Sequence, residues 1–173
     1  MLVAAVLTGL LHSGADAGGT PARPFIDGRW QGGIETGPDS PDFAECWAGT
    51  TFGDGTTLTL AERRDGTWLL RLSNPGWQLP DAQRYTMLAQ VDFYPRLRVS
   101  AEARTPTLLE IADPDPTSLV GLIEYGHTIN LASVGFNEKY DLEGSAKIIE
   151  RIRTCSAGRF AAERPATKNG PGQ

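Results

Sequence analysis

Two cysteines, Cys46 and Cys155, stand about a hundred residues apart and nearly bracket the part of the chain that is richest in expected strands. Because the chain has no other cysteine, only one intramolecular disulfide is possible. Closing a loop of about 100 residues stabilises a fold by up to ~4–5 kcal/mol in the chain-entropy model. We therefore predict a domain closed by a Cys46–Cys155 disulfide. Two buried free thiols are the alternative, and a metal site is less favoured because soft metal sites usually need three or four Cys or His ligands.

The N-terminus has the layout of a secretory signal. An apolar run extends from Leu2 to Leu11, and the small-residue tripeptide Ala15-Asp16-Ala17 follows it. An apolar stretch of about 7–15 residues before such a site is typical of a signal peptide. We therefore predict a signal peptide over residues 1–17 and a mature protein in the periplasm or outside the cell, where disulfides persist. A buried N-terminal strand or helix is the alternative.

The charge of the chain excludes two classes of partner. The formal net charge is −5, and no run or stripe of Lys and Arg is present. Nucleic acids and anionic membrane surfaces attract proteins through clustered basic residues. The sequence therefore predicts no nucleic-acid partner. After residue 17 no apolar stretch reaches the roughly 20 residues that a membrane span needs, so we expect no integral membrane span in the mature chain.

The centre of the chain alternates between apolar and polar residues on both sides of an Asp-Gly turn. Residues 57–62 alternate with a period of two, Asp65-Gly66 follows, and Trp68, Leu70 and Leu72 share one face of the next segment. Alternation that flanks an Asp-Gly pair is the strongest short-range signal for a hairpin. We predict a β-hairpin here. Asn74-Pro75-Gly76 should end its second strand, because proline lacks a ladder donor and glycine accepts positive φ.

Several further short segments have strand character and are separated by turns. They are residues 85–92, 95–101, 107–111 and 128–134. Short antiparallel strands with one apolar face favour a sandwich or an open barrel. We predict one β domain over residues 46–155, preceded by a loosely ordered leader over 18–45 with one short strand, and followed by a disordered tail over 156–173.

Two segments have helical rather than strand periodicity. Asp115 is a candidate N-cap with proline at the first helical position, and Gly126 stands where a left-handed residue would end that helix. The second helix should run from about residue 142 to 155, with Asp141 as its cap and an apolar face that recurs every three or four residues. The expected fold is therefore mainly β with two short helices, and the disulfide would tie the C-terminal helix to the start of the sheet.

Residues 115–126 (DPTSLVGLIEYG) and 141–146 (DLEGSA) resemble segments of a known family. The first is similar to a short helix in the invasion-associated locus B family of alphaproteobacterial secreted proteins. The second is similar to the family's Ser-Leu-x-Gly-Phe segment that leads into a helix, with Asp141 in place of the serine and Ser145 in place of the phenylalanine. The likeness covers about residues 108–155. It implies a secreted β-sandwich with helical additions and no established catalytic activity, and no residue of this chain bears the family's association with host-cell entry.

A search for catalytic residues finds candidates but no complete set. His127 would have to be the base of a Ser-His-Asp hydrolase, yet no Gly-x-Ser-x-Gly elbow is present to hold a nucleophile. A Cys-His protease conflicts with the disulfide, because an oxidised sulfur is no nucleophile. We expect His127 to be a surface or capping residue.

Acidic residues give no sharper prediction. A glycosidase needs two carboxylates that face each other across a cleft, and several carboxylates are available: Asp92, Glu102, Glu110, Asp113 and Glu124. Asp54-Gly55 and Asp113-Pro114-Asp115 contain carboxylates of the kind that bind calcium, but the twelve-residue EF-hand pattern is absent. These aspartates are better interpreted as turn and cap residues. No glycine-rich phosphate loop is present, and we predict no catalytic, metal or cofactor site.

Tryptophan gives the remaining indication of a binding site. All four tryptophans lie in the first half of the chain, and Trp77 follows the Asn-Pro-Gly turn. An exposed tryptophan on a loop can anchor a partner. The competing and more common interpretation is that Trp77 covers one end of the core. We keep Trp77 as a possible binding surface.

Three hypotheses on function follow. The first is an exported, non-enzymatic β-domain that acts through protein or envelope binding, with an envelope or secreted protein as the expected partner. The second is an inhibitor or regulator of a secreted hydrolase, for which a small disulfide-locked domain is suitable. The third is a hydrolase that uses carboxylates or His127.

Overall fold

The computed structural model describes residues 24–36, 43–113 and 119–163, so the expected signal peptide lies outside the described residues. Within these ranges the chain forms ten strands and two helices. The strands are β1 (Phe25–Asp27), β2 (Trp30–Thr36), β3 (Phe43–Thr51), β4 (Thr57–Arg63), β5 (Trp68–Ser73), β6 (Arg84–Val91), β7 (Leu97–Thr105), β8 (Leu108–Asp113), β9 (Thr128–Ser133) and β10 (Phe136–Asp141). The helices are α1 (Leu119–Tyr125) and α2 (Ser145–Glu163).

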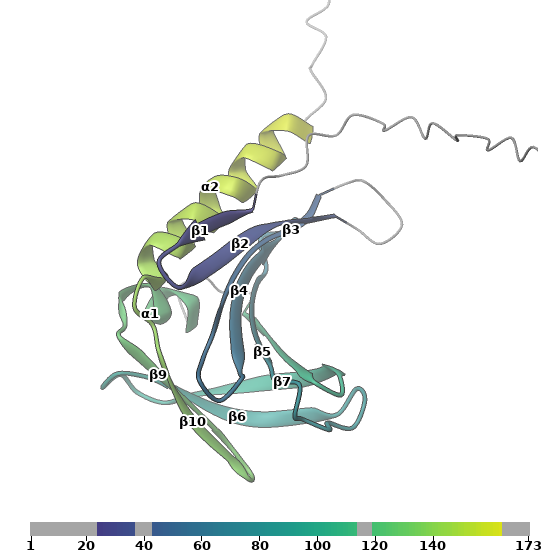
Figure 1. Ribbon diagram of the computed structural model, residues 1–173, viewed down its shortest axis with the longest axis vertical. Helices are drawn as coiled ribbons and strands as arrows, with labels where there is room; N and C mark the ends of the chain where they lie inside the picture. The colour runs from purple at the N-terminus through teal and green to yellow at the C-terminus, as the bar shows by residue number, and fades with distance from the viewer. Residues whose placement is uncertain (1–23, 37–42, 114–118, 164–173) are drawn as a thin grey trace, which may run out of the picture.

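All ten strands belong to one antiparallel sheet. Their order is β1-β2-β3-β4-β5-β8-β7-β6-β9-β10, so β1 and β10 are the two edges. Figure 1 shows that the sheet is strongly curved and that α1 and α2 lie beside β1, β2 and the upper end of β9. The prediction of a mainly β protein with two helices is confirmed. Of the two architectures left open, a sandwich and an open barrel, the single curved sheet that does not close corresponds to the open barrel.

The predicted hairpin is formed by β4 and β5. Gly66 has a φ of 81° in the turn, and the Asp65 carboxylate accepts a hydrogen bond of 2.9 Å from the N–H of Thr67. Leu58 and Leu60 pair with Leu72 and Leu70 across the two strands, and all four side chains are at most 1% exposed. Each buried leucine contributes about 1.5–3 kcal/mol relative to an exposed one. The inner face of this hairpin is therefore the centre of the core.

The disulfide forms as predicted. Cys46 on β3 is bonded to Cys155 on α2, with 6.2 Å between their Cα atoms. The same face of α2 buries Ile148, Ile149 and Ile152. Helix α2 packs on β3 and β4 and also contacts α1. The bond therefore ties a C-terminal helix to the third strand of the sheet, in addition to the apolar contacts between them.

The segment before Cys46 is more ordered than we expected. Within the predicted leader, β1 and β2 pair with each other, and β2 pairs with β3 along most of its length. Trp30 is 1% exposed and its indole N–H donates to the carbonyl of Glu143 over 2.8 Å. A Cβ on Gly32 would lie 2.3 Å from the carbonyl oxygen of Trp47. The glycines that suggested a loose leader thus permit a close approach of two strands.

The prediction of a disordered tail after Cys155 was also partly wrong. Helix α2 does not end near Cys155 but continues to Glu163, through a stretch that contains three alanines, one arginine and one glutamate. These residues have high helix propensity. The side chain of Ser156 is buried. Residues 164–173 lie outside the described part of the chain. The helix starts at Ser145, and Asp141 binds the N–H of Glu143 in the turn before it rather than capping its first turn.

Asp113 binds the first turn of α1, and the end of the helix differs from the predicted signal. The Asp113 carboxylate accepts hydrogen bonds of 3.0 Å from the N–H groups of Leu119 and Val120. Asp115 lies outside the described residues. Gly126 does not have a positive φ. A Cβ there would lie 2.1 Å from Cγ1 of Val91, so glycine is needed for close packing rather than for a left-handed turn.

The other predicted strands are confirmed as β6, β7, β8 and β9, with ends that differ by a few residues. Strand β10 was not predicted. It contains two aromatic residues, Phe136 and Tyr140, among polar and charged ones, and the burial of its partner β9 decides its position. Among the residues that the structure describes, no helix is long and apolar enough to cross a membrane.

Candidate functional site

An apolar pocket opens between the β5–β6 loop and the β9–β10 turn. It has a volume of about 350 Å³. Trp77 and Phe136 form one wall, and Tyr85, Met87 and Leu109 line the sheet side. Ligand pockets in proteins typically measure about 300–1,000 Å³ and are lined mainly by apolar and aromatic groups. The pocket therefore has the size and chemistry to hold one apolar group.

The β5–β6 loop fixes the position of Trp77. The side-chain oxygen of Asn74 accepts a 2.8 Å hydrogen bond from the N–H of Gly76, and the carbonyl of Asn74 accepts one from the N–H of Trp77. The N–H of Leu79 donates to the carbonyl of Pro106, which fastens the loop to the β7–β8 turn. The Asn-Pro-Gly turn predicted from sequence thus presents the indole in one place.

Trp77 combines the two roles that the sequence left open. Its indole packs edge-to-face on Phe136 with ring centroids 5.8 Å apart, and it lies against the core while remaining partly exposed. Such an aromatic pair contributes about 0.5–1.5 kcal/mol beyond the area that it buries. Trp77 therefore covers one end of the core and also lines the pocket. That it binds a partner stays a prediction.

The β9–β10 turn forms the opposite rim. Val134 is fully exposed, and Gly135 has a φ of 77°, which favours glycine at this position of a two-residue turn. Ser133 donates its hydroxyl to the carbonyl of Thr86 over 3.0 Å and so holds the turn on β6. The sequence analysis missed this rim. The Val134-Gly135 pair between two polar-apolar segments was the signal that could have found it.

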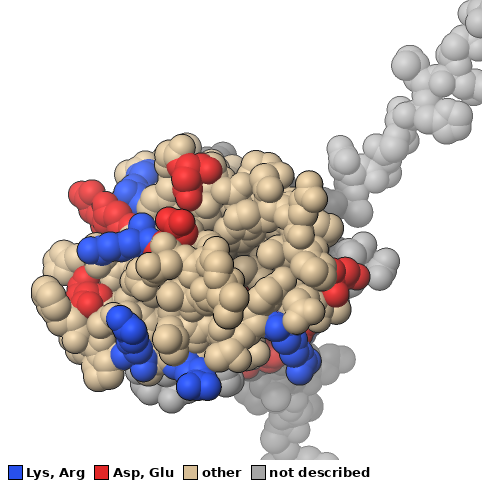
Figure 2. Space-filling model, turned by 90° about the horizontal axis from the view of Figure 1, so that it is seen from below, with Lys and Arg blue, Asp and Glu red and all other residues tan. Residues whose placement is uncertain are grey.

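The molecule is hollowed on the face that contains this turn. Figure 2 shows uncharged residues around the hollow and charged side chains towards the margins of the face. Interfaces typically have few charged residues at their centre and a polar rim. The surface around the pocket therefore supports contact with another molecule.

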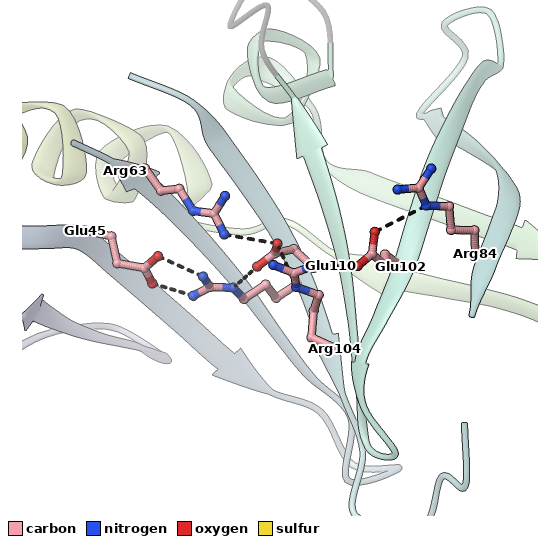
Figure 3. Close-up of polar contacts among 7 residues, drawn as sticks. Glu45, Arg63, Arg84, Glu102, Arg104 and Glu110 are labelled. Carbon is pink, nitrogen blue, oxygen red and sulfur yellow. Dashed lines mark hydrogen bonds and ion pairs between the residues drawn. The ribbon is translucent and has the colours of Figure 1, made fainter. Parts of the chain in front are cut away.

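The outer face of the sheet has a network of ion pairs. Arg71 lies at its centre, bonded to Glu45 by both terminal nitrogens and to Glu110 by Nε at 2.9 Å (Figure 3). Arg63 and Arg104 also reach Glu110, at 3.1 and 3.4 Å. Burial disfavours the charge of Arg71, but the hydrogen bonds that it donates to Glu45 and Glu110 outweigh this effect and raise the pKa of the guanidinium.

This network does not have the arrangement of a glycosidase pair. The carboxylates of Glu45 and Glu110 share one guanidinium instead of facing each other across open space. Glu102, another of the predicted candidates, lies at the margin, where the hydrogen bond from Arg104 lowers its pKa against the opposing effect of burial. An acid that donates a proton to a leaving group needs a raised pKa. These carboxylates are better explained as stabilising the packing of neighbouring strands.

The remaining candidate acids also have structural partners. Glu124 forms an ion pair of 2.8 Å with Arg153, and Asp113 caps α1. Asp54 accepts hydrogen bonds from the N–H and the hydroxyl of Thr56, as expected of a turn residue. In the described ranges, no group of three or more His, Cys, Asp or Glu side chains could hold a metal ion.

His127 lies on the surface, as we expected. Its side chain is 92% exposed and its Nδ1 is 3.4 Å from Oδ2 of Asp92. Within the described chain its ring has no hydrogen bond to a serine or a cysteine. The N–H of His127, together with the N–H and hydroxyl of Thr128, lowers the pKa of Asp92 to about 2, although burial opposes the shift. The pair fastens the β6–β7 turn to the start of β9.

A second, shallower depression borders this pair. It is lined by Asp92, His127 and three aromatic residues: Phe93, Tyr94 and Tyr125. Phe93 is fully exposed and Tyr125 is 75% exposed. Exposed aromatic groups on a fixed turn can serve as anchors for a partner. The volume of this depression, about 600 Å³, exceeds that of the pocket beside Trp77, but the depression is more open to solvent and therefore the weaker candidate.

Comparison with known proteins supports the fold alone. No protein-family model matches the sequence, and no curated protein has a matching sequence. One solved structure that matches is the crystal structure of invasion associated protein B from Bartonella henselae, with a TM-score of 0.59 and 15% sequence identity. The match covers 79% of this chain and 99% of that one. The likeness seen in residues 108–155 therefore extends to most of the chain as a similarity of fold to the Bartonella protein.

Proposed function

We propose that the protein is an exported, non-enzymatic binding module that takes an apolar group of an envelope or secreted protein into the pocket beside Trp77. The observation that carries this proposal is the pocket itself, which is about 350 Å³ and has aromatic and aliphatic walls at an exposed rim. Tryptophan and other large side chains in such pockets account for most of the binding energy at protein interfaces. Met87 in the floor adds adaptability, because its unbranched side chain can repack around different groups.

Export is the second part of the proposal. It is supported by the layout of residues 1–17 and by the disulfide between Cys46 and Cys155, since such bonds persist in oxidising compartments. With the disulfide formed, no free cysteine is left among the described residues. A rigid domain of this kind loses little conformational entropy when it binds, which favours affinity.

The test is site-specific photocrosslinking in intact cells. A benzophenone amino acid at Val134, on the pocket rim, should give a discrete protein adduct, whereas the same group at the exposed Ile26 of β1 should not. The purified partner should then bind Val134→Glu at least tenfold more weakly than the parent protein and bind Ile26→Glu unchanged, because a carboxylate at the rim must be desolvated. Equal adducts at both positions, or equal affinities, would reject the pocket as the site.

A second candidate function is the inhibition or regulation of a secreted hydrolase. The specific observation is the β6–β7 turn, where Phe93 projects fully exposed and Asp92 is held by three hydrogen bonds from His127 and Thr128. A rigid loop with an exposed aromatic side chain can enter the cleft of an enzyme without much ordering entropy.

This candidate is tested with secreted proteases and lysozymes. Addition of the purified protein should lower the activity of one of them, and Phe93→Ala should relieve that effect while Tyr125→Ala, a neighbouring exposed aromatic, serves as the matched control. Unchanged activity across the panel would remove the inhibitor hypothesis and leave the pocket hypothesis standing.

A further inference from the structure

The edge strand β10 runs from the Trp77 pocket along the open side of the sheet. We propose that the partner is an extended peptide segment that pairs with β10 and places one apolar side chain in that pocket. This inference rests on the proposed function and specifies the chemistry of the partner. Its basis is the arrangement of the β10 backbone, the direction of its side chains and one unpaired charge.

The ladder between β9 and β10 decides which backbone groups are free. The N–H of Leu142 donates to the carbonyl of His127 over 2.8 Å, which marks that pair as hydrogen-bonded. Hydrogen-bonded pairs alternate along an antiparallel ladder. In the register of β9 and β10, Phe136, Glu138 and Tyr140 therefore bond to β9. The N–H and C=O groups of Asn137, Lys139 and Asp141 point away from it.

A hydrogen bond at one end of the strand supports this assignment. The carbonyl of Asp141 accepts a 3.1 Å bond from Arg29, which reaches it from the side away from β9. In the part of the chain that the structure describes, no strand pairs with β10 on that side. Asn137 and Lys139 are both exposed. Their four outward backbone groups are thus available to an added strand, which is the main source of affinity in β-augmentation.

The pocket lies at the correct place for a side chain of that strand. Phe136 is on the inner face of β10, and its ring forms one wall of the pocket with Trp77. In a strand pair, directly opposite side chains share a face, with Cβ atoms about 4.5–5.5 Å apart. A partner residue opposite Phe136 would therefore lie on the inner face beside the Phe136 ring, next to the pocket. Its neighbours would point the other way.

Glu138 adds a charge to the same face, two residues along the strand. It is exposed and forms no ion pair with any described residue. Inward-pointing charges on edge strands also discourage self-association, so Glu138 would select a partner of opposite charge. Every neighbouring pair in the sheet is antiparallel. An antiparallel partner would present a basic residue opposite Glu138 and, two positions later, an apolar residue opposite Phe136.

The test uses a capped peptide of sequence Thr-Thr-Arg-Thr-Leu-Thr-Thr and the full, disulfide-bonded protein. Binding should shift the indole N–H resonance of Trp77 in NMR spectra and slow the hydrogen exchange of the amides of Asn137 and Lys139. N-methylation of the threonine between the arginine and the leucine should weaken binding about tenfold or more, because it removes backbone hydrogen bonds and leaves both side chains in place.

Two protein variants provide matched controls. Lys139→Pro removes one outward N–H without touching the β9 ladder, and it should weaken binding about tenfold, whereas Lys139→Ala keeps the N–H and should bind as the parent does. Glu138→Arg should weaken binding of the arginine peptide and restore binding of a peptide that has glutamate at that position. This exchange of charges distinguishes an ion pair from a change in folding.

Failure of this inference and failure of the proposed function give different results. If the N-methylated peptide binds equally well and the Asn137 amide is not protected, the pocket holds a side chain but β10 adds no strand, and the inference is overturned. Saturable binding of octanoate at Trp77 with no binding of the peptide would also overturn it and indicate an acyl group. If neither probe shifts the Trp77 resonance, the proposed function fails as well.

Discussion

The first edge of the sheet is covered and held by charge, whereas the last edge is open. On β1, Asp27 forms ion pairs with Lys147 and Arg151 of α2, at 2.8 and 3.1 Å. The disulfide fastens the same helix two strands further in. On β10, residues 137–139 are exposed, and no described strand pairs with them on the side away from β9. The difference indicates which end of the molecule maintains the fold and which end is available to a partner.

Tryptophan substitutions at the two ends should separate these roles most strongly. Trp30 is buried at the covered end, so Trp30→Ala should lower the free energy of unfolding by about 3–5 kcal/mol. Trp77 is partly exposed, so Trp77→Ala should lower it by less, about 1–2 kcal/mol, and abolish binding at the pocket. Urea unfolding and peptide titration measure the two effects. Equal losses of stability in the two variants would contradict the view that one end maintains the fold and the other is available to a partner.

Removal of the disulfide should have the next largest effect. The double variant Cys46→Ala/Cys155→Ala should lose about 2–4 kcal/mol of stability, because the bond constrains the unfolded chain. Hydrogen exchange should accelerate in β1, β2 and α2 more than in β9 and β10. A uniform acceleration would show that the covered end and the open end unfold as one unit.

Acid should weaken the open half of the molecule. The pKa of Asp92 is lowered to about 2 by the N–H groups and the hydroxyl that bind it. A carboxylate with a lowered pKa stabilises the fold above its unfolded pKa, and this contribution is lost as the pH falls through the folded value. Asp92→Asn should therefore lower the unfolding temperature at pH 6 and make much less difference near pH 2. An equal effect at both values would contradict this account.

At the covered end, protonation by acid should instead raise stability, and this is the smallest of the expected effects. Glu62 lies opposite Cys46 on the core face, and Oε2 of its carboxylate has no hydrogen-bond partner among the described residues. Burial raises the pKa of Glu62, against the smaller effects of the nearby Ser156 hydroxyl and of Arg153. The raised pKa means that ionisation of Glu62 opposes folding above about pH 4.5. Glu62→Gln should give a small rise in unfolding temperature at pH 7 that disappears at pH 4.

Local patterns in the sequence predicted the parts of the fold that depend on local physics. The Asp65-Gly66 hairpin follows from the conformational freedom of glycine and the alternation on either side of it. The pairing of Cys46 with Cys155 followed from their number alone. The leader was wrong because Gly32 and Gly33 suggested looseness, whereas the close approach of β2 to β3 is a contact between segments. No local pattern shows such a contact.

The candidate site was predicted only at one residue. Trp77 was recognised because it follows the Asn-Pro-Gly turn, but Phe136, which forms the same wall of the pocket, lies almost sixty residues later in the chain. Strand β10 has too few apolar residues for its periodicity to be evident, and β9 determines its place. The carboxylates named as possible catalytic acids could be assigned to caps and ion pairs only once their partners were known.

The order of the residues by itself determined the alternating strands, the turns between them, the two helical segments and the single possible disulfide, because these depend on neighbours within a few positions or on a count. The tertiary structure decided that the sheet curls without closing, that β1 is held by α2 while no described strand covers the outer side of β10, and that Trp77 meets Phe136. These are contacts between segments far apart in the chain, and their free energy depends on the packing of the whole domain.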